Sequence, residues 1–375
     1  MQKVLVVGQT PPPYHGQAIM IDRLVKYNFD KVELYFVRMA FSENLEEVGK
    51  FQFGKILHLL KLIVEILKVR IKYNINVLYY PPSGPVKISI YRDIIILNLV
   101  RPFFKKVIFH FHAGGVSESY EELPSILKPL FRGAYYKSDA SILISDFNPQ
   151  DGTNMYSKEQ VVIPYGVTDE ASMLNGKVVK LKDNTIRILF VGAVRETKGV
   201  TTLIETADLL RQRGVSGFEF HIVGPFFTDE YEREAKGKVT HLGLQKEVLF
   251  RGLLVGEEKQ AAYKQADIFC FPTFYEAETF GIVLLEAMQF NLPVVASRWR
   301  GIPSIVTDGE DGFLVPVQDP ASVADKLEVL MNSPELREAM GRKGRLRFES
   351  NFTLDVFMNK MQDLFIQVGT KKCIT

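Results

Sequence analysis

The chain has 375 residues, of which 46% are hydrophobic and 24% charged, and its formal net charge is only +2. A chain of this length is too long for one compact core, so two domains are expected. The small net charge gives no reason to expect a nucleic-acid partner. The two cysteines, Cys270 and Cys373, favour a reducing compartment. With no signal-peptide pattern and no bilayer-spanning apolar run, we expect a cytoplasmic protein, free or peripheral on the inner face of the plasma membrane.

The first half of the chain alternates predicted strands with predicted helices. Because strands that alternate with helices form parallel βαβ units, this half is expected to be a Rossmann-like α/β domain. Strands are expected at residues 4–8, 32–38, 77–80, 107–111 and 140–144, and helices at about 17–27, 55–72 and 92–104.

A second α/β pattern begins after a polar stretch that is typical of an interdomain connection. The expected domains are therefore residues 1–167 and 184–350. Strands are expected at residues 186–192, 218–224, 248–252, 268–272 and 294–297, with helices at 201–213 and at about 353–368.

The most informative segment is FYEAETFG at residues 274–281, which follows a buried-looking strand and leads into an apolar helix. Ligands of open α/β sheets bind at the carboxyl ends of strands. We expect Glu278 in the turn and Glu286 about two turns into the helix, where a carboxylate would accept ligand hydroxyls or pair with a cation. The alternative is that Glu278 only caps the helix and Glu286 is exposed on its outer face.

The segment resembles the donor-sugar signature of retaining glycosyltransferases of family 4, in the GT-B superfamily (glycosyl transferases group 1). Asn291 stands where the family usually has Gly, and Asn tolerates the left-handed conformation expected there. The resemblance implies two Rossmann-like βαβ domains that face a central cleft, with the last helix packed back on the first domain. The matching blocks are Ala277-Glu278-Thr279-Phe280-Gly281, Glu286-Ala287-Met288, residues 291–296, Gly301-Ile302-Pro303 and residues 308–312.

The resemblance also implies a nucleotide-diphosphate sugar, with UDP or GDP as the nucleotide, bound mainly by the second domain. Glu286 would hold the ribose hydroxyls. Glu278 and the backbone N–H groups near Phe280 and Gly281 would fix the sugar ring. The donor-binding residues expected on this segment are Glu278, Thr279, Phe280, Gly281, Ile282 and Glu286.

Residues 192–199 form a loop with glycines and cations between a strand and a helix, which suits a diphosphate. Lys198 and Gly199 match a Lys-Gly pair of the family, but Ala193 stands where the family usually has Arg. We expect Arg195 to supply that charge. Lys198 and Arg195 would then stabilise the leaving diphosphate without a metal. The alternative is that both are solvated loop charges.

Two segments of the first domain add candidates. The resemblance implies that the proline-rich loop before Gly16 approaches the donor phosphate, where a side chain would prevent contact. The loop is not a G-x-G-x-x-G motif, so no dinucleotide cofactor is expected. The resemblance implies that His112, at a strand end, contacts the sugar or its phosphate; His110 shares its face. The alternative for these histidines is a role as core residues, and the alternative for the proline-rich loop is a purely structural turn. No metal is expected, because no carboxylate or Cys lies at ligand spacing.

The helix at residues 55–72 carries a mostly basic stripe on an otherwise apolar sequence. With neighbouring cations it could rest on an anionic membrane leaflet. The alternative is a crossover helix with a solvated stripe. The stripe comprises Lys55, His58, Lys61, Glu65, Lys68 and Lys72, and the neighbouring cations are Arg92, Arg101, Lys105 and Lys106.

We therefore expect a retaining, metal-independent glycosyltransferase that acts on a glycan or lipid-linked glycan in bacterial surface polysaccharide biosynthesis. Two alternatives stay open: a GT-B-like sugar-nucleotide epimerase, and a non-catalytic membrane-docking subunit of a glycan assembly complex. The sequence does not identify the nucleotide, the sugar, the acceptor, the linkage or the oligomeric state.

Overall fold

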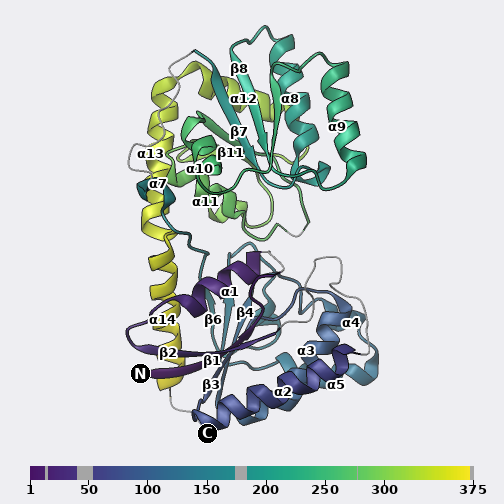
Figure 1. Cartoon of the computed structure of the whole chain (residues 1–375), viewed down its shortest axis with the longest axis vertical. Helices are drawn as coiled ribbons and strands as arrows, with labels where there is room; N and C mark the ends of the chain where they lie inside the picture. The colour runs from purple at the N-terminus through teal and green to yellow at the C-terminus, as the bar shows by residue number, and fades with distance from the viewer. Residues whose placement is uncertain (13–15, 40–53, 174–183, 277, 372–375) are drawn as a thin grey trace. The chain divides into compact units, whose positions relative to one another are not determined.

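The computed structural model describes residues 1–12, 16–39, 54–173, 184–276 and 278–371. The chain divides into two compact units (Figure 1). Unit 1 comprises Met1–Tyr165 and Asp355–Thr375, and unit 2 comprises Gly166–Leu354. Each unit contains a six-stranded sheet whose strands pair in parallel.

The sheet of unit 1 has the order β2-β1-β3-β4-β5-β6, which reverses direction between β1 and β3. Its longer helices connect or cover these strands. The strands are β1 (Gln2–Gly8), β2 (Val32–Arg38), β3 (Val77–Tyr80), β4 (Lys106–Phe111), β5 (Ala140–Leu143) and β6 (Gln160–Val162), and the helices are α1 (Gly16–Lys26), α2 (Gly54–Lys72), α3 (Lys87–Val100), α5 (Lys128–Tyr135) and α14 (Leu354–Thr370).

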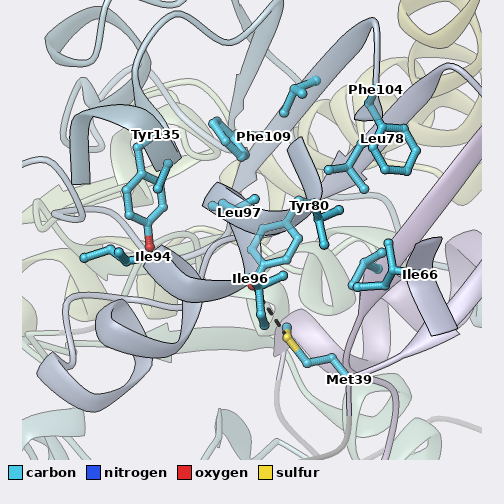
Figure 2. Packing of buried hydrophobic residues seen from close by; sticks show 14 of the residues in the cluster. Met39, Ile66, Leu78, Tyr80, Ile94, Ile96, Leu97, Phe104, Phe109 and Tyr135 are labelled. Carbon is cyan, nitrogen blue, oxygen red and sulfur yellow. Dashed lines mark hydrogen bonds between the residues drawn. The ribbon is translucent and has the colours of Figure 1, made fainter. Parts of the chain in front are cut away.

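One hydrophobic core cluster of unit 1 lies on one face of this sheet. Strand residues alternate between faces, so Leu78 and Tyr80 of β3 point to the same side as Phe109 of β4. Figure 2 shows these side chains packed with Leu97 of α3 and Ile66 of α2. Helices α2, α3 and α5 therefore form one layer on this face.

The sheet of unit 2 has the order β12-β11-β10-β7-β8-β9, which reverses between β7 and β10. Ligands of doubly wound sheets bind outside the carboxyl ends of the strands at such a reversal. The elements are β7 (Ile186–Val191), α8 (Val200–Gln212), β8 (Phe218–Val223), α9 (Asp229–His241), β9 (Val248–Gly252), α10 (Gly256–Gln265), β10 (Ile268–Phe271), α11 (Ile282–Gln289), β11 (Val294–Ser297), β12 (Gly312–Val315), α12 (Pro320–Asn332) and α13 (Pro334–Asn351).

The helix expected at residues 92–104 is displaced. It begins at Lys87 and ends at Val100, where a 3-10 turn, η2 (Arg101–Phe103), takes over. Pro102 explains this end, because proline cannot donate the hydrogen bond that would continue an α-helix. Strands β6 and β12 were not predicted.

Two further expectations concern membranes and cysteines. Among the described helices, none combines the length and the hydrophobicity that a bilayer span requires. Cys270 is buried in β10, and burial raises the pKa of its thiol above the ordinary range. Cys373 lies outside the described residues.

Candidate active site

The loops that follow β7 and β10 pack directly against each other in unit 2. The backbone N–H of Phe274 donates to the carbonyl of Thr197 at 2.8 Å. Gly199 has a φ of 82°, and a Cβ at this position would lie 2.1 Å from the carbonyl oxygen of Pro272. Only glycine fits this left-handed, crowded position. The packing brings the cationic loop after β7 against the acidic loop after β10.

Lys198 and Glu278 form an ion pair across these two loops. Their side chains are 16% and 11% exposed. The Lys198 ammonium also lies 4.7 Å from the ring centroid of Tyr275 and 5.5 Å from that of Phe271. An ammonium group has three donors. Lys198 can therefore hold a phosphate oxygen while it stays bonded to Glu278.

Arg195 lies beside two aromatic rings. Its guanidinium carbon is 4.4 Å from the ring centroid of Phe227 and 4.8 Å from that of Tyr275. Contact with two rings positions a cation by electrostatic attraction and packing. The alternative of a solvated loop charge is therefore wrong for Lys198, which is paired with Glu278. Arg195 is half-buried beside these rings, and its role in diphosphate binding stays a prediction. Both cations contact the ring of Tyr275, a residue that sequence analysis did not single out.

The helix α11 begins at Ile282, and its N-cap residue is Gly281, with a φ of 89°. Glu278 precedes this cap and pairs with Lys198 instead, so the alternative in which Glu278 caps the helix is wrong. The N–H groups of a first helical turn lack partners within the helix. The acidic loop therefore ends at a group of backbone donors suited to an anionic or hydroxylated ligand.

The loop between Glu278 and α11 packs against the backbone at Gly301 and the ring of Phe352. A Cβ at Gly301 would lie 2.0 Å from the Thr279 carbonyl oxygen, so these two segments are in close contact. The Phe280 ring is buried, and its centroid lies 6.1 Å from that of Phe352. Only the backbone of Phe280 can therefore face a ligand.

Glu286 is the fifth residue of α11, one turn into the helix rather than two, because the helix begins later than expected. Its Oε1 lies 2.7 Å from Lys259 Nζ, and the hydroxyl of Tyr263 donates to its Oε2 at 2.8 Å. The side chain is 19% exposed. The alternative of an exposed outer position is therefore wrong. The sequence allowed either ligand hydroxyls or a cation as the partner of this carboxylate, and the structure shows the cation Lys259.

Lys259 and Tyr263 both lie on α10, and the sequence analysis missed them. Burial, and then the charge of Glu286, raise the pKa of the Tyr263 hydroxyl well above its ordinary range. Tyr263 therefore stays a hydrogen-bond donor near neutral pH and fixes the orientation of the carboxylate. No sequence signal links α10 with Glu286, since the contact is made only by the fold.

The two histidines of unit 1 stack on each other, with ring centroids 3.9 Å apart. His112 Nδ1 lies 2.5 Å from the hydroxyl oxygen of Tyr165, and His110 Nδ1 lies 2.6 Å from that of Tyr79. Burial lowers the pKa of His110 to about 3. His110 is therefore a neutral core residue near neutral pH. His112 is 5% exposed, and its role in sugar binding stays a prediction.

Gly16 is the first residue of α1 and is exposed. Among the described residues, no atom beyond its chain neighbours lies within 4 Å of the position that its Cβ would take. Packing in unit 1 thus does not require glycine here. Residues 13–15 of the preceding loop lie outside the described part of the chain. The predicted contact with a donor phosphate stays a prediction.

Two further residues of the motif are placed by the structure. Asn291 has a φ of 58°, which confirms the left-handed conformation expected after the helix. The indole N–H of Trp299 donates to the carbonyl of Tyr275 at 2.9 Å. Trp299, whose role the sequence did not indicate, therefore holds the loop that carries Glu278.

The acidic run at residues 308–312 is used within its own loop. Asp308 pairs with Arg298 at 2.8 Å and accepts the backbone N–H of Leu314 at 3.0 Å. Asp311 accepts the N–H of Thr307 at 2.8 Å. Across the described ranges, no group of three or more His, Cys, Asp and Glu side chains is arranged to hold a metal ion.

Most of the cations predicted to accompany the basic stripe of α2 are used internally. Arg92 pairs with Asp93 at 2.8 Å, and Lys106 pairs with Asp139 at 3.3 Å. Arg101 donates to the carbonyls of residues 133, 134 and 137. These three side chains are therefore not available to an anionic surface, which corrects the sequence-based expectation. Lys105 is exposed, and the side chain of Lys55 lies outside the described residues.

Comparisons with known proteins find a family match in the second half of the chain. Residues 175–347 match the family described as Glycosyl transferases group 1. The D-inositol 3-phosphate glycosyltransferase of Corynebacterium efficiens is 33% identical over 50% of this chain and 44% of its own length. The capsular polysaccharide biosynthesis glycosyltransferase CapM of Staphylococcus aureus is 28% identical over 51% and 49%. The chain thus spans about half the length of these curated relatives.

Solved structures extend the likeness to nearly the whole chain. The structure of Anabaena Alr3699/HepE in complex with UDP aligns with a TM-score of 0.72 and 16% identity. The alignment covers 98% of this chain and 100% of that one. The predicted fold class, GT-B with two Rossmann-like units, is confirmed.

Proposed function

We propose that this chain, whose residues 175–347 match the family described as Glycosyl transferases group 1, is a retaining glycosyltransferase that uses a nucleotide-diphosphate sugar. The observation that carries this proposal is the ion pair of Lys198 with Glu278 at the reversal point of the second sheet. Cations suit a diphosphate, and carboxylates suit sugar hydroxyls. The names of the curated relatives support a glycosyltransferase.

In this proposal Glu286 binds the ribose of the donor. A carboxylate has about four acceptor positions, so the ribose hydroxyls can donate to Glu286 while Lys259 and Tyr263 hold it. These two α10 residues would keep the carboxylate oriented toward the ribose. The nucleotide would be UDP or GDP.

Lys198 and Arg195 would bind the diphosphate and stabilise the negative charge that grows as it leaves. Gly16 of unit 1 would offer its backbone N–H to the same group. Fixed cations that are partly shielded from water stabilise such charge effectively. The charge can therefore be provided by side chains, and we propose a metal-independent reaction.

Glu278, Thr279 and Ile282, with the backbone N–H groups of Phe280 and Gly281, would hold the transferred sugar, and His112 would contact the sugar or its phosphate. The acceptor oxygen would bond to the anomeric carbon on the face from which the phosphate oxygen departs. That phosphate oxygen would take the proton of the acceptor hydroxyl. The bond that forms and the bond that breaks lie on the same face, so the anomeric configuration is retained.

The acceptor would be a glycan or a lipid-linked glycan of a bacterial surface polysaccharide. Similarity to a capsular polysaccharide glycosyltransferase supports this class. We propose that the protein acts in the cytoplasm, at the inner face of the plasma membrane.

A transfer assay tests the proposal. The purified chain is incubated with UDP-sugars and GDP-sugars, with and without a bacterial lipid extract, and the products are identified by mass spectrometry and their anomeric configuration by NMR. We expect a glycosylated lipid with retained configuration. E278Q and K198M should lose most activity, whereas E276Q, an exposed neighbour, should not.

The outcomes separate the candidate functions. An epimerised donor that forms without any acceptor would indicate an epimerase. Inverted configuration would refute the retaining mechanism. If no donor were turned over with any extract, the chain would be a non-catalytic subunit.

A further inference from the structure

The outer surface of the α2–α3–α5 layer of unit 1 is unusually apolar. Large hydrophobic side chains are exposed on each of its helices and on the short turns beside them. They are Leu57, Leu60, Val64 and Ile71 on α2; Ile88, Tyr91, Ile95 and Leu99 on α3; Phe103 in η2; and Ile126 and Leu130 at and before the start of α5.

These side chains point outward together because the three helices bury their inner sides on one face of the sheet. Ile94 and Leu97 of α3 pack toward the core strands, as Figure 2 shows. Helix α3 contacts both α2 and α5, and Figure 1 shows the three helices along one side of the unit. The exposed residues therefore belong to one continuous surface, here called the apolar face.

Helix α3 is the most unusual part of the apolar face. Ile88, Tyr91, Ile95 and Leu99 recur at the spacing of one helical stripe, and the stripe is opposite the buried one. A surface helix normally carries polar residues there. Ile95 and Leu99 are 44% and 50% exposed, so they are not covered by a neighbouring element.

Unit 2 provides an internal comparison. Its exposed apolar side chains are dispersed over different helices and loops, which is normal for a soluble protein. In the described part of this unit they are Met173, Phe227, Leu253, Val255, Val329 and Leu346. A contiguous apolar surface as in unit 1 indicates a binding surface.

The charges around the apolar face indicate its partner. Along α2, the exposed Lys61, Lys68 and Lys72 lie beside the apolar residues, and Glu65 is the one exposed acid of this described helix. Lys87 begins α3, where its Nζ lies 3.5 Å from Oε2 of Glu122 in the short helix α4 (Ser119–Glu122). Lysines can extend along apolar surface while their ammonium groups reach lipid phosphates.

We propose that the apolar face docks on an anionic lipid leaflet, with the α3 stripe inserted below the headgroups and the α2 lysines at the phosphates. The outer stripe of α3 offers no hydrogen-bonding group apart from the hydroxyl of Tyr91, which suits insertion into hydrocarbon. The exposed charges beside it on the described part of α2 are cations apart from Glu65, which suits anionic headgroups. The proposal rests on the proposed function only in that a lipid-linked acceptor would lie in the same leaflet.

Vesicle binding tests this proposal without any donor. The full chain is mixed with phosphatidylcholine vesicles that contain phosphatidylglycerol, or with pure phosphatidylcholine vesicles, and the bound fraction is measured by flotation. We expect binding to the anionic vesicles that weakens with added salt. The double variant I95E/L99E should bind about tenfold more weakly or worse, because insertion would bury two charges. The control variant V329E/L346E, at exposed apolar positions on helices of unit 2, should bind like wild type.

The lysines are tested separately by K61E/K68E, which should reduce binding to anionic vesicles and not to pure phosphatidylcholine. Tryptophan placed by I95W should shift its emission to shorter wavelengths on vesicles, whereas L346W should not. Equal binding of I95E/L99E and wild type, or no binding of wild type, would overturn the proposal. Self-association that I95E/L99E abolishes, without vesicle binding, would assign the face to a second copy of the chain.

The two proposals fail independently. I95E/L99E should still be stabilised thermally by nucleotide sugars, because its changes lie outside unit 2. E286Q should bind vesicles like wild type but respond weakly to nucleotide sugars. Wild-type chain that responds to nucleotide sugars but does not bind vesicles would refute only the docking proposal. Wild-type chain that binds vesicles but does not respond to any nucleotide sugar would refute only the proposed function.

Discussion

At the scale of single residues, Glu286 shows how a carboxylate can be prepared for a ligand. Its two oxygens are held by different side chains of α10, Lys259 and Tyr263. The sequence predicted that this charge needed a partner, since it interrupts an apolar helix. It could not identify the partners, because α10 and α11 come into contact only in the folded chain.

Replacing Glu286 with Gln should weaken donor binding. Loss of charged hydrogen bonds to the ribose should remove about 1.5–3 kcal/mol, which corresponds to a roughly tenfold to hundredfold rise in KM for the nucleotide sugar. Steady-state kinetics with E276Q as control measure this. An unchanged KM would show that Glu286 serves only the ion pair with Lys259.

The low pKa of His110 implies that the stability of the fold depends on pH. Its pKa is about 3 in the folded chain and near 6.5 when unfolded. The unfolded state therefore binds more protons below pH 6.5, and stability should fall as the pH falls. At pH 5 this loss should be about 2 kcal/mol relative to neutral pH.

The variant H110N removes this titration and serves as the comparison. Urea unfolding of both proteins at pH 7 and pH 5 should show a smaller loss of stability for H110N. Parallel losses in the two proteins would mean that His110 is protonated in the folded state.

At the scale of elements, the alternation of strands and helices predicted most of the fold. Strands such as β2 and β11 were predicted with their observed bounds, because they are apolar and bordered by turn residues. The four-residue β12 and the displaced start of α3 were missed, since tertiary packing rather than local pattern determines them. The position of Glu286 was misjudged by one turn for the same reason.

Gly199 tests how tightly the β7 and β10 loops pack. Gly199 and Gly214 have nearly the same φ, 82° and 81°, but only Gly199 has backbone atoms within 4 Å of a Cβ position. Alanine at either site should cost about 1–2 kcal/mol for the left-handed conformation. G199A should lose about 1–3 kcal/mol more and should also weaken donor binding, since Lys198 precedes it.

Urea unfolding and thermal stabilisation by nucleotide sugars measure both effects. Equal behaviour of G199A and G214A would show that the contact with Pro272 is not required for the site.

At the scale of the whole molecule, each unit is built on a parallel sheet whose strand order reverses once, and the proposed donor site lies at the reversal in unit 2. The sequence predicted two Rossmann-like units, and the fold is confirmed by solved structures. The strand order is not encoded in any local pattern, so the meeting of the β7 and β10 loops could be known only from the structure. The signature residues were recognised through resemblance, whereas Tyr275, Lys259 and Tyr263 were not.

Chelation tests the proposed source of positive charge. If Lys198 and Arg195 stabilise the leaving diphosphate, transfer should stay within about twofold after EDTA treatment, and K198M should lose roughly a hundredfold or more. A loss with EDTA that Mg²⁺ or Mn²⁺ restores would show that a metal supplies this charge.

A structure with bound nucleotide sugar is the sharpest test of the donor site proposed for unit 2. A crystal structure of the chain with its donor should show the diphosphate at Lys198 and Arg195, and the ribose hydroxyls on Glu286. Donor density that contacts none of these three side chains, in a complex shown to be active, would contradict the account.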